Sequence, residues 1–169
     1  MRLYPRREGN PRRFFLALFL LLLSALGGVI LMAAREDPEN LPLLLGFLLV
    51  DLFLTGGLLY WLSGFPQRLF YELNSPVLTV HQPLGPRTVH RSEVVEVRLL
   101  SFALPWWSLR GEVSMPGFHR RRLRLEGLPV EAFVGARRGE GVLLVLKNGA
   151  GLLLNPEDPL PLLRWKEGT

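Results

Sequence analysis

The amino-acid sequence predicts a membrane α-helical hairpin followed by a mainly β domain, and three observations lead to this fold class. Two long segments near the N-terminus are almost free of charge. The rest of the chain consists of short apolar segments separated by Gly, Pro and Asn, as in antiparallel β structure. Mean hydropathy is +0.23 and 49% of the 169 residues are hydrophobic, which is too apolar for an ordinary soluble domain.

The first apolar segment covers residues 14–34 and reads FFLALFLLLLSALGGVILMAA. As a helix, its 21 residues rise about 31 Å, close to the hydrocarbon thickness of a bilayer, about 30 Å. This segment is therefore predicted to span a membrane.

The second apolar segment, residues 41–62, contains one charged residue, Asp51. Its eleven Leu, two Phe and one Val favour insertion by about 0.3 to 0.6 kcal/mol each, against a cost of about 2.5 to 3.5 kcal/mol for a central Asp. The apolar contribution is larger, so this segment is also predicted to span. Between the two segments, Pro38 breaks the helix and Asn40 is placed to cap the next one.

Arginines at positions 2, 6, 7, 12 and 13 precede the first segment, whereas the connecting turn holds one arginine beside three acidic residues. The positive-inside rule then places both termini in the cytoplasm. A rival interpretation takes Arg12 and Arg13 as a twin-arginine export signal, but the apolar run is long for such a signal and no clear small-residue cleavage site follows. The predicted organisation is a basic cytoplasmic N-terminus (1–13), a two-helix transmembrane hairpin (14–62) and a β domain (67–169).

The β domain is predicted to contain nine strands followed by one short helix. Asn148 and Gly149 give the strongest hairpin signal. In the tail, Asn155 is placed to cap the helix and Pro156 suits its first turn, while later prolines keep it short. The predicted strands cover residues 69–73, 77–82, 87–91, 94–101, 110–113, 120–125, 130–136, 142–146 and 151–154.

A resemblance to a known family rests on four segments of this region, which read YELNSPVLTVHQ, PLGPRTVHRSEVVEVRLL, SMPGFHRRRL and EAFVGARRGEGVLLVLKNGAGLLLNPEDPLPLL. Together they resemble the bacterial pleckstrin-homology-like domains of small membrane proteins, over about residues 69–163. The final hairpin with its KNG turn is the most specific part. The resemblance implies a curled, partly open β-barrel capped by one C-terminal helix, with a binding or assembly role. The LPWWSL insertion and the triple arginine depart from the family pattern.

Asp51 is a candidate functional residue, because an ionisable group at membrane depth is a functional hypothesis by default. In an antiparallel hairpin it lies level with Ser24, whose hydroxyl can donate to it, and Thr55 lies one turn away on the same face. Ser24 and Gly28 have the small-xxx-small spacing that lets a second helix approach closely. Polar packing within the hairpin, contact with a partner's membrane helix and proton transport remain open, although a lone carboxyl is a poor proton relay.

Arg120, Arg122 and Arg124 alternate along a predicted strand and so point to one side of it. Such a row can meet phosphates of an anionic leaflet, each contact contributing about 1 kcal/mol, or it can serve as a charged edge that blocks aggregation. Nucleic acid is not expected as a partner, because stacking aromatics are missing from this segment.

Trp106 and Trp107 lie in an unusually apolar connection between two predicted strands. They are candidates for contact with lipid headgroups or with a groove on a partner. Burial in the domain's own core is the alternative.

His81 and His90 are expected on one face of a hairpin in which Gln82 pairs with Arg87, but no third metal ligand is evident, so a solvated polar face is favoured over a metal site. The sequence contains no cysteine, no nucleophile elbow and no phosphate-binding glycine loop before a helix. Enzyme activity, a metal and a cofactor are therefore not expected.

The functional expectation is a non-catalytic accessory, assembly or scaffold protein of the bacterial cytoplasmic (inner) membrane, which binds another membrane protein through its domain and spans. Recognition of anionic lipid headgroups by the arginine row is the alternative, because a net charge of +5 suits an anionic neighbour. Membrane lipids and a second copy of the chain are further candidate partners.

Overall fold

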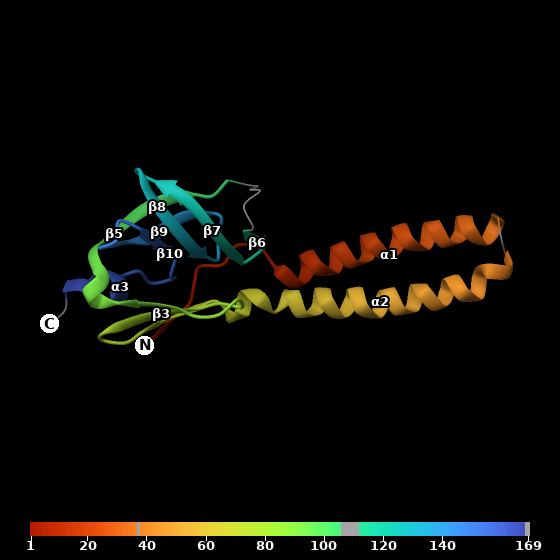
Figure 1. Ribbon diagram of the computed structural model, residues 1–169, viewed down its shortest axis with the longest axis horizontal. Coiled ribbons are helices and arrows are strands. Elements are labelled where there is room, and N and C mark those ends of the chain that lie inside the picture. The colour runs from red at the N-terminus through yellow and green to blue at the C-terminus, as the bar shows by residue number, and fades with distance from the viewer. Residues whose placement is uncertain (37, 106–111, 168–169) are drawn as a thin grey trace. The chain divides into compact units, whose positions relative to one another are not determined.

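The computed structural model describes residues 1–36, 38–105 and 112–167. The chain forms two compact units, each described here by itself. The helical unit is Asn10–Gly64, and the β unit combines Met1–Gly9 with Phe65–Thr169. Figure 1 shows the elements of each unit.

The helical unit is a hairpin of two long helices, as predicted. Helix α1 (Pro11–Glu36) has 26 residues and helix α2 (Leu41–Ser63) has 23, with a short 3-10 turn, η1 (Pro38–Asn40), before α2. The two helices lie side by side (Figure 1), and both are long and apolar enough to cross a membrane. Most of their apolar side chains are exposed, which favours insertion into a membrane over the role of core helices in a soluble protein.

One stripe of α2 is buried or half-buried, and its spacing of three and four residues marks the side that packs on α1. Its residues are Leu44, Leu48, Leu52, Thr55, Gly56 and Leu59. Gly56 allows Phe19 of α1 to approach closely, since a Cβ at this glycine would lie 3.2 Å from Cε2 of Phe19. Asn40 occupies the N-cap position of α2 as predicted, but its side chain makes no capping hydrogen bond.

In the part of the β unit that the structure describes, the strands form two sheets. The four-stranded sheet has the order β1-β2-β3-β4, and the six-stranded sheet has the order β5-β9-β10-β8-β7-β6. Neighbouring strands are antiparallel except for the parallel pair β8 and β10. The bounds are β1 Arg2–Leu3, β2 Phe70–Leu73, β3 Val77–His81, β4 Arg87–His90, β5 Val94–Ala103, β6 Val113–Met115, β7 Phe118–Leu125, β8 Leu128–Val134, β9 Arg138–Leu146 and β10 Gly151–Leu154.

The resemblance implied one curled, partly open β-barrel, and this expectation is corrected. Among the described residues, the strands form two sheets that are neither closed nor curled. A 3-10 turn, η3 (Arg91–Glu93), separates β4 from β5, and β5 pairs along its length with β9 instead of with β4. The four-stranded sheet therefore ends at β4. Eight of the strands, β2 to β5 and β7 to β10, correspond to predicted segments, and the hairpin at Asn148–Gly149 is confirmed. The predicted segment 110–113 overlaps β6 at Val113 alone, and its residues 110 and 111 lie outside the described residues.

The predicted register of the hairpin β3–β4 is wrong by two residues. Arg87 pairs with Val80, not with Gln82, and Thr79 pairs with Thr88. A shift of two keeps every side chain on its predicted face. His81 and His90 therefore do share a face, and the connecting loop is longer than expected.

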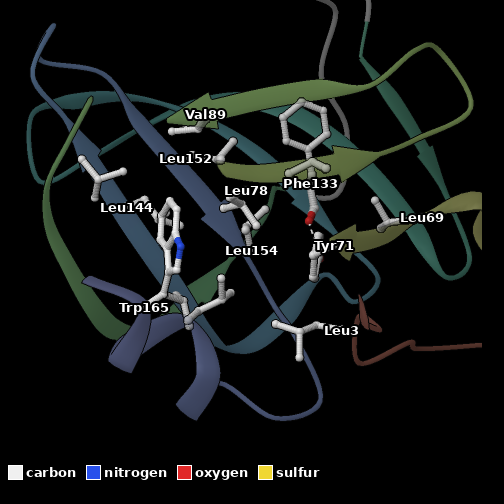
Figure 2. Close-up of a cluster of buried hydrophobic side chains, with 14 of the residues drawn as sticks. Leu3, Leu69, Tyr71, Leu78, Val89, Phe133, Leu144, Leu152, Leu154 and Trp165 are labelled. Carbon is white, nitrogen blue, oxygen red and sulfur yellow. Dashed lines mark hydrogen bonds between the residues drawn. The ribbon is translucent and has the colours of Figure 1, made fainter. Parts of the chain in front are cut away.

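The main core lies between the two sheets and the C-terminal helix α3 (Leu160–Glu167). Figure 2 shows Leu78 and Val89 of one sheet close to Leu144, Leu152 and Leu154 of the other. A second apolar cluster covers the opposite face of the six-stranded sheet. Both faces of this sheet are thus apolar near its centre, which explains why β9 and β10 read as continuous runs of Leu and Val.

Trp165 fixes helix α3 to the β unit. Its ring enters the main core (Figure 2), and its indole Nε1 donates to the carbonyl oxygens of Asn74 and Ser75, each at 3.0 Å. The predicted cap of this helix is wrong: the carboxylate of Asp158, not Asn155, accepts from the first helical amide, Leu160 N, at 3.0 Å. Pro156 forms a β-bridge with Pro5, and Pro159 disfavours helical geometry at Asp158, so the helix begins later than predicted, at Leu160.

Residues 1–9 belong to the β unit, a connection that the sequence analysis did not foresee. Arg2 and Leu3 pair with β2, and Leu3 is buried in the main core. Further along, Arg6 N donates to Asn155 O at 2.8 Å and Glu8 N donates to Gly135 O at 3.0 Å. The segment that precedes α1 is therefore held by the domain that follows α2.

Candidate ligand cavity and intramembrane carboxyl

The three arginines of the predicted row lie on one face of β7, opposite Phe133, Glu131 and Pro129 of β8. Phe133 belongs to the main core, so the row is on the core side of the six-stranded sheet. Strand β6 pairs only with residues 118–120, and beyond that point Arg122 N donates to the carboxylate of Glu112 at 3.0 Å. Arg122 and Arg124 thus lie on a part of β7 that β6 leaves open.

The three arginines differ in their partners. Arg120 is partly buried, its Nη2 lies 3.0 Å from Oε1 of Glu131, and its guanidinium stacks over the ring of Phe133 at 5.6 Å. Arg122 and Arg124 are exposed, and among the described residues neither guanidinium forms an ion pair. Arg120 therefore stabilises the fold, whereas the guanidinium groups of Arg122 and Arg124 remain available to bind a ligand.

A cavity of about 610 Å³ brings Arg122 and Arg124 together with Arg87, the first residue of β4. Its apolar wall includes Val89, Leu146 and Leu152. The arginines therefore come from both sheets, around a hollow at the end of the main core. Arg87 is not predictable from the sequence as part of this site, because nothing local indicates that the start of β4 lies near β7.

A cluster of polar residues is buried on the opposite face of β7. Arg121 lies 3.7 Å from Oε2 of Glu112, and His119 Nδ1 is 2.8 Å from the hydroxyl of Ser114. Burial, and then the positive charges of Arg137 and Arg121, lower the pKa of His119 to about 4. His119 is therefore neutral at physiological pH and serves this cluster as a hydrogen-bonding group.

Asp51 lies midway along α2 and is exposed. The hydroxyl of Thr55, one turn further on, is 3.4 Å from Asp51 Oδ1, which agrees with the predicted common face. Ser24 instead donates to the carbonyl oxygen of Leu21 in its own helix, at 2.8 Å. A small cavity of about 20 Å³ lies between Asp51 and residues of α1, including Leu22 and Leu26, and is large enough for one water molecule.

The remaining predicted sites are placed as follows. Trp106 and Trp107 lie outside the described residues. His81 pairs with Glu72, its Nε2 lying 2.9 Å from Oε2, and it stacks on Phe70. No cluster of three metal-ligating residues occurs within the parts of the chain that the structure describes.

No protein-family model matches the chain, and neither a curated protein nor a solved structure matches it. The pleckstrin-homology-like assignment therefore stays a prediction from sequence segments. The two units place this chain among proteins that combine two candidate membrane helices with a β-rich domain and a short C-terminal helix.

Proposed function

We propose that this chain is a non-catalytic accessory or scaffold protein of the bacterial cytoplasmic membrane, which binds a second membrane protein. The two helices anchor it, both termini lie in the cytoplasm, and the β unit is a pleckstrin-homology-like binding module. The observation that carries the proposal is the exposed carboxyl of Asp51 in the middle of α2.

An exposed carboxyl at the centre of a span is costly in lipid. An aspartate there costs about 2.5 to 3.5 kcal/mol when it faces hydrocarbon. The hydroxyl of Thr55 offers a single long hydrogen bond, and Ser24 donates elsewhere. A donor from a partner's membrane helix would remove much of this cost, so contact with a partner is favoured over polar packing within the hairpin.

The surface around Asp51 suits a second helix. Phe47, Leu54 and Leu58 are exposed and lie at the i−4, i+3 and i+7 positions relative to Asp51, on the same face of α2. The buried stripe that packs on α1 lies beside this face. A partner helix seated there would cover apolar side chains and the carboxyl together.

Support for the β unit as a binding module comes from its sequence resemblance and from its closing helix, whose Trp165 packs into the core. The cytoplasmic placement rests on the five arginines that precede the first apolar segment, two of which lie in the first turn of α1. The binding role of the β unit and its cytoplasmic placement are both parts of the proposal.

Site-specific photocrosslinking in cells tests the proposal. A photoreactive amino acid at Phe47 or Leu54 should give an adduct with another membrane protein, because both positions flank Asp51. The same probe at Phe53 is the matched control, since this side chain is more exposed but lies about 160° around the helix from Asp51.

Substitution of Asp51 separates hydrogen bonding from mere apolar contact. Asp51→Asn should keep the adduct at Leu54, because an amide still accepts and donates hydrogen bonds, and Asp51→Leu should weaken it. An adduct made solely of two copies of this chain would contradict a distinct protein partner. Equal adducts at all three probe positions would contradict a specific face.

A further inference from the structure

We propose that the cavity between β4 and β7 is a binding site for the phosphate group of a small organic anion, held by Arg87, Arg122 and Arg124. This inference goes beyond the proposed partner contact of the spans and does not depend on it. All the residues that line the cavity belong to the β unit.

The charge of the cavity lining favours an anion. Glu131 also lines the cavity, but it is 3.0 Å from Arg120, which neutralises it. The other three arginines have no acidic partner among the described residues and contribute three positive charges. Guanidinium groups in the same cavity repel one another, and a bound anion would relieve that repulsion.

Arginine also fits the geometry of phosphate. A guanidinium has a planar fork of N–H donors that binds two phosphate oxygens at once. Arg87 reaches the cavity from the four-stranded sheet, whereas Arg122 and Arg124 reach it from the six-stranded sheet. Donors that converge from two elements would surround a tetrahedral anion better than a single row could.

The size and the wall of the cavity indicate more than a free phosphate ion. A volume of about 610 Å³ is within the range of sites for small organic ligands, about 300 to 1,000 Å³. Val89, Leu146 and Leu152 form an apolar wall next to the arginines. The chemistry therefore fits a phosphate ester with a small organic body, either a soluble metabolite or the headgroup of a phospholipid.

Calorimetric titration of the full chain in a neutral detergent, with sn-glycerol 3-phosphate as the probe, tests the site. Arg87→Ala, Arg122→Ala and Arg124→Ala should each weaken binding about tenfold, because each removes a charged hydrogen bond to the anion. Arg138→Ala is the matched control: Arg138 is exposed at the start of β9 and outside the cavity, so this variant should bind like the wild type.

Glu131→Gln provides a change in the opposite direction. It removes the negative charge of the lining and releases Arg120, so it should strengthen binding about fivefold. A purely structural role of these residues would not produce this gain. Lack of binding at millimolar probe, or equal weakening in Arg138→Ala, would overturn the proposal.

Competition distinguishes the two sources of the phosphate. The chain is placed in nanodiscs of phosphatidylglycerol or of phosphatidylcholine, and titrated with the same soluble probe. A lower apparent affinity in phosphatidylglycerol assigns the site to an anionic headgroup. Equal affinity in both lipids, with the arginine dependence kept, assigns it to a soluble ester.

Discussion

At the scale of single residues, Asn155 holds the β unit together. It is buried, and its Oδ1 accepts from Gly135 N at 2.8 Å while its Nδ2 donates to Arg6 O at 2.8 Å. The hydroxyl of Tyr71 lies 3.3 Å from the same Oδ1 and donates to Phe133 O at 2.7 Å. Burial raises the pKa of Tyr71 well above its ordinary value, which keeps this hydroxyl protonated and able to donate.

Asn155→Ala should therefore lower the free energy of unfolding by about 2 to 4 kcal/mol, because it leaves buried amide and carbonyl groups without partners. Thermal unfolding of the purified chain, followed by tryptophan fluorescence, measures the effect. Asn148→Ala is the matched control, since Asn148 lies at the exposed turn before β10, where its Oδ1 accepts a hydrogen bond from Ala150 N at 3.0 Å and where water can replace that bond. A loss no larger than that of the control would contradict the role of Asn155.

His119 makes stability depend on pH. Its pKa is about 4 in the folded protein against 6.5 ordinarily. Between pH 4 and 6.5, His119 is therefore protonated in the unfolded chain and neutral in the folded chain. As the pH drops from 6.5 to 4, the free energy of unfolding should fall by up to about 1.4 kcal/mol per pH unit. Unfolding measurements across this range test the slope.

His119→Gln should reduce that slope, since glutamine does not titrate. His90→Gln is the matched control, because His90 is exposed. An unchanged slope in His119→Gln would assign the pH dependence to other groups.

At the scale of elements, the N-terminal segment, residues 1–9, belongs to the β unit although it precedes α1 in the sequence. A Cβ at Gly135 would lie 2.8 Å from the carbonyl oxygen of Arg6, too close for the backbone to stay in place. Gly135 thus permits the close approach of residues 5–8 to the end of β8.

Gly135→Ala should displace this segment while β2 to β10 remain folded. Arg6 and Arg7 would then become cleavable by trypsin, which is measured as faster loss of an N-terminal tag from the purified chain. Gly57→Ala, with open space around the added carbon, is the control for a glycine substitution. Equal cleavage rates in both variants would show that the segment is not held at Gly135.

At the scale of the whole molecule, the shared β unit constrains topology. Residues before α1 and residues after α2 form hydrogen bonds with each other, such as Arg6 with Asn155. If both helices cross a membrane, both ends of the chain must therefore lie on one side. The arginines before α1 predict that this side is the cytoplasm.

The natural chain has no cysteine, so single cysteines report topology directly. In intact cells, a membrane-impermeant thiol reagent should label Glu36→Cys, at the C-terminal end of α1, and should leave Ser92→Cys unlabelled. Tyr4→Cys should behave like Ser92→Cys, since both positions are exposed on the β unit. Labelling of Ser92→Cys alone would reverse the orientation.

Most helices and strands follow from local sequence patterns. A run of more than twenty apolar residues forms a helix long enough to span, whatever surrounds it. Alternation and turn residues located β2 to β5 and β7 to β10, because side-chain direction along a strand is a local property. The common face of Arg120, Arg122 and Arg124, and that of Asp51 and Thr55, were predictable on this basis.

Which elements become neighbours depends instead on long-range packing. The pairing of β5 with β9, the addition of residues 1–9 to β2, the place of Arg87 beside the arginine row and the burial of Asn155 all join residues far apart in the chain. Arg6 and Asn155, for example, are 149 residues apart. The physical reason is that local patterns set the direction of a side chain, whereas the choice of neighbour depends on how whole faces pack and on which buried polar groups then find partners.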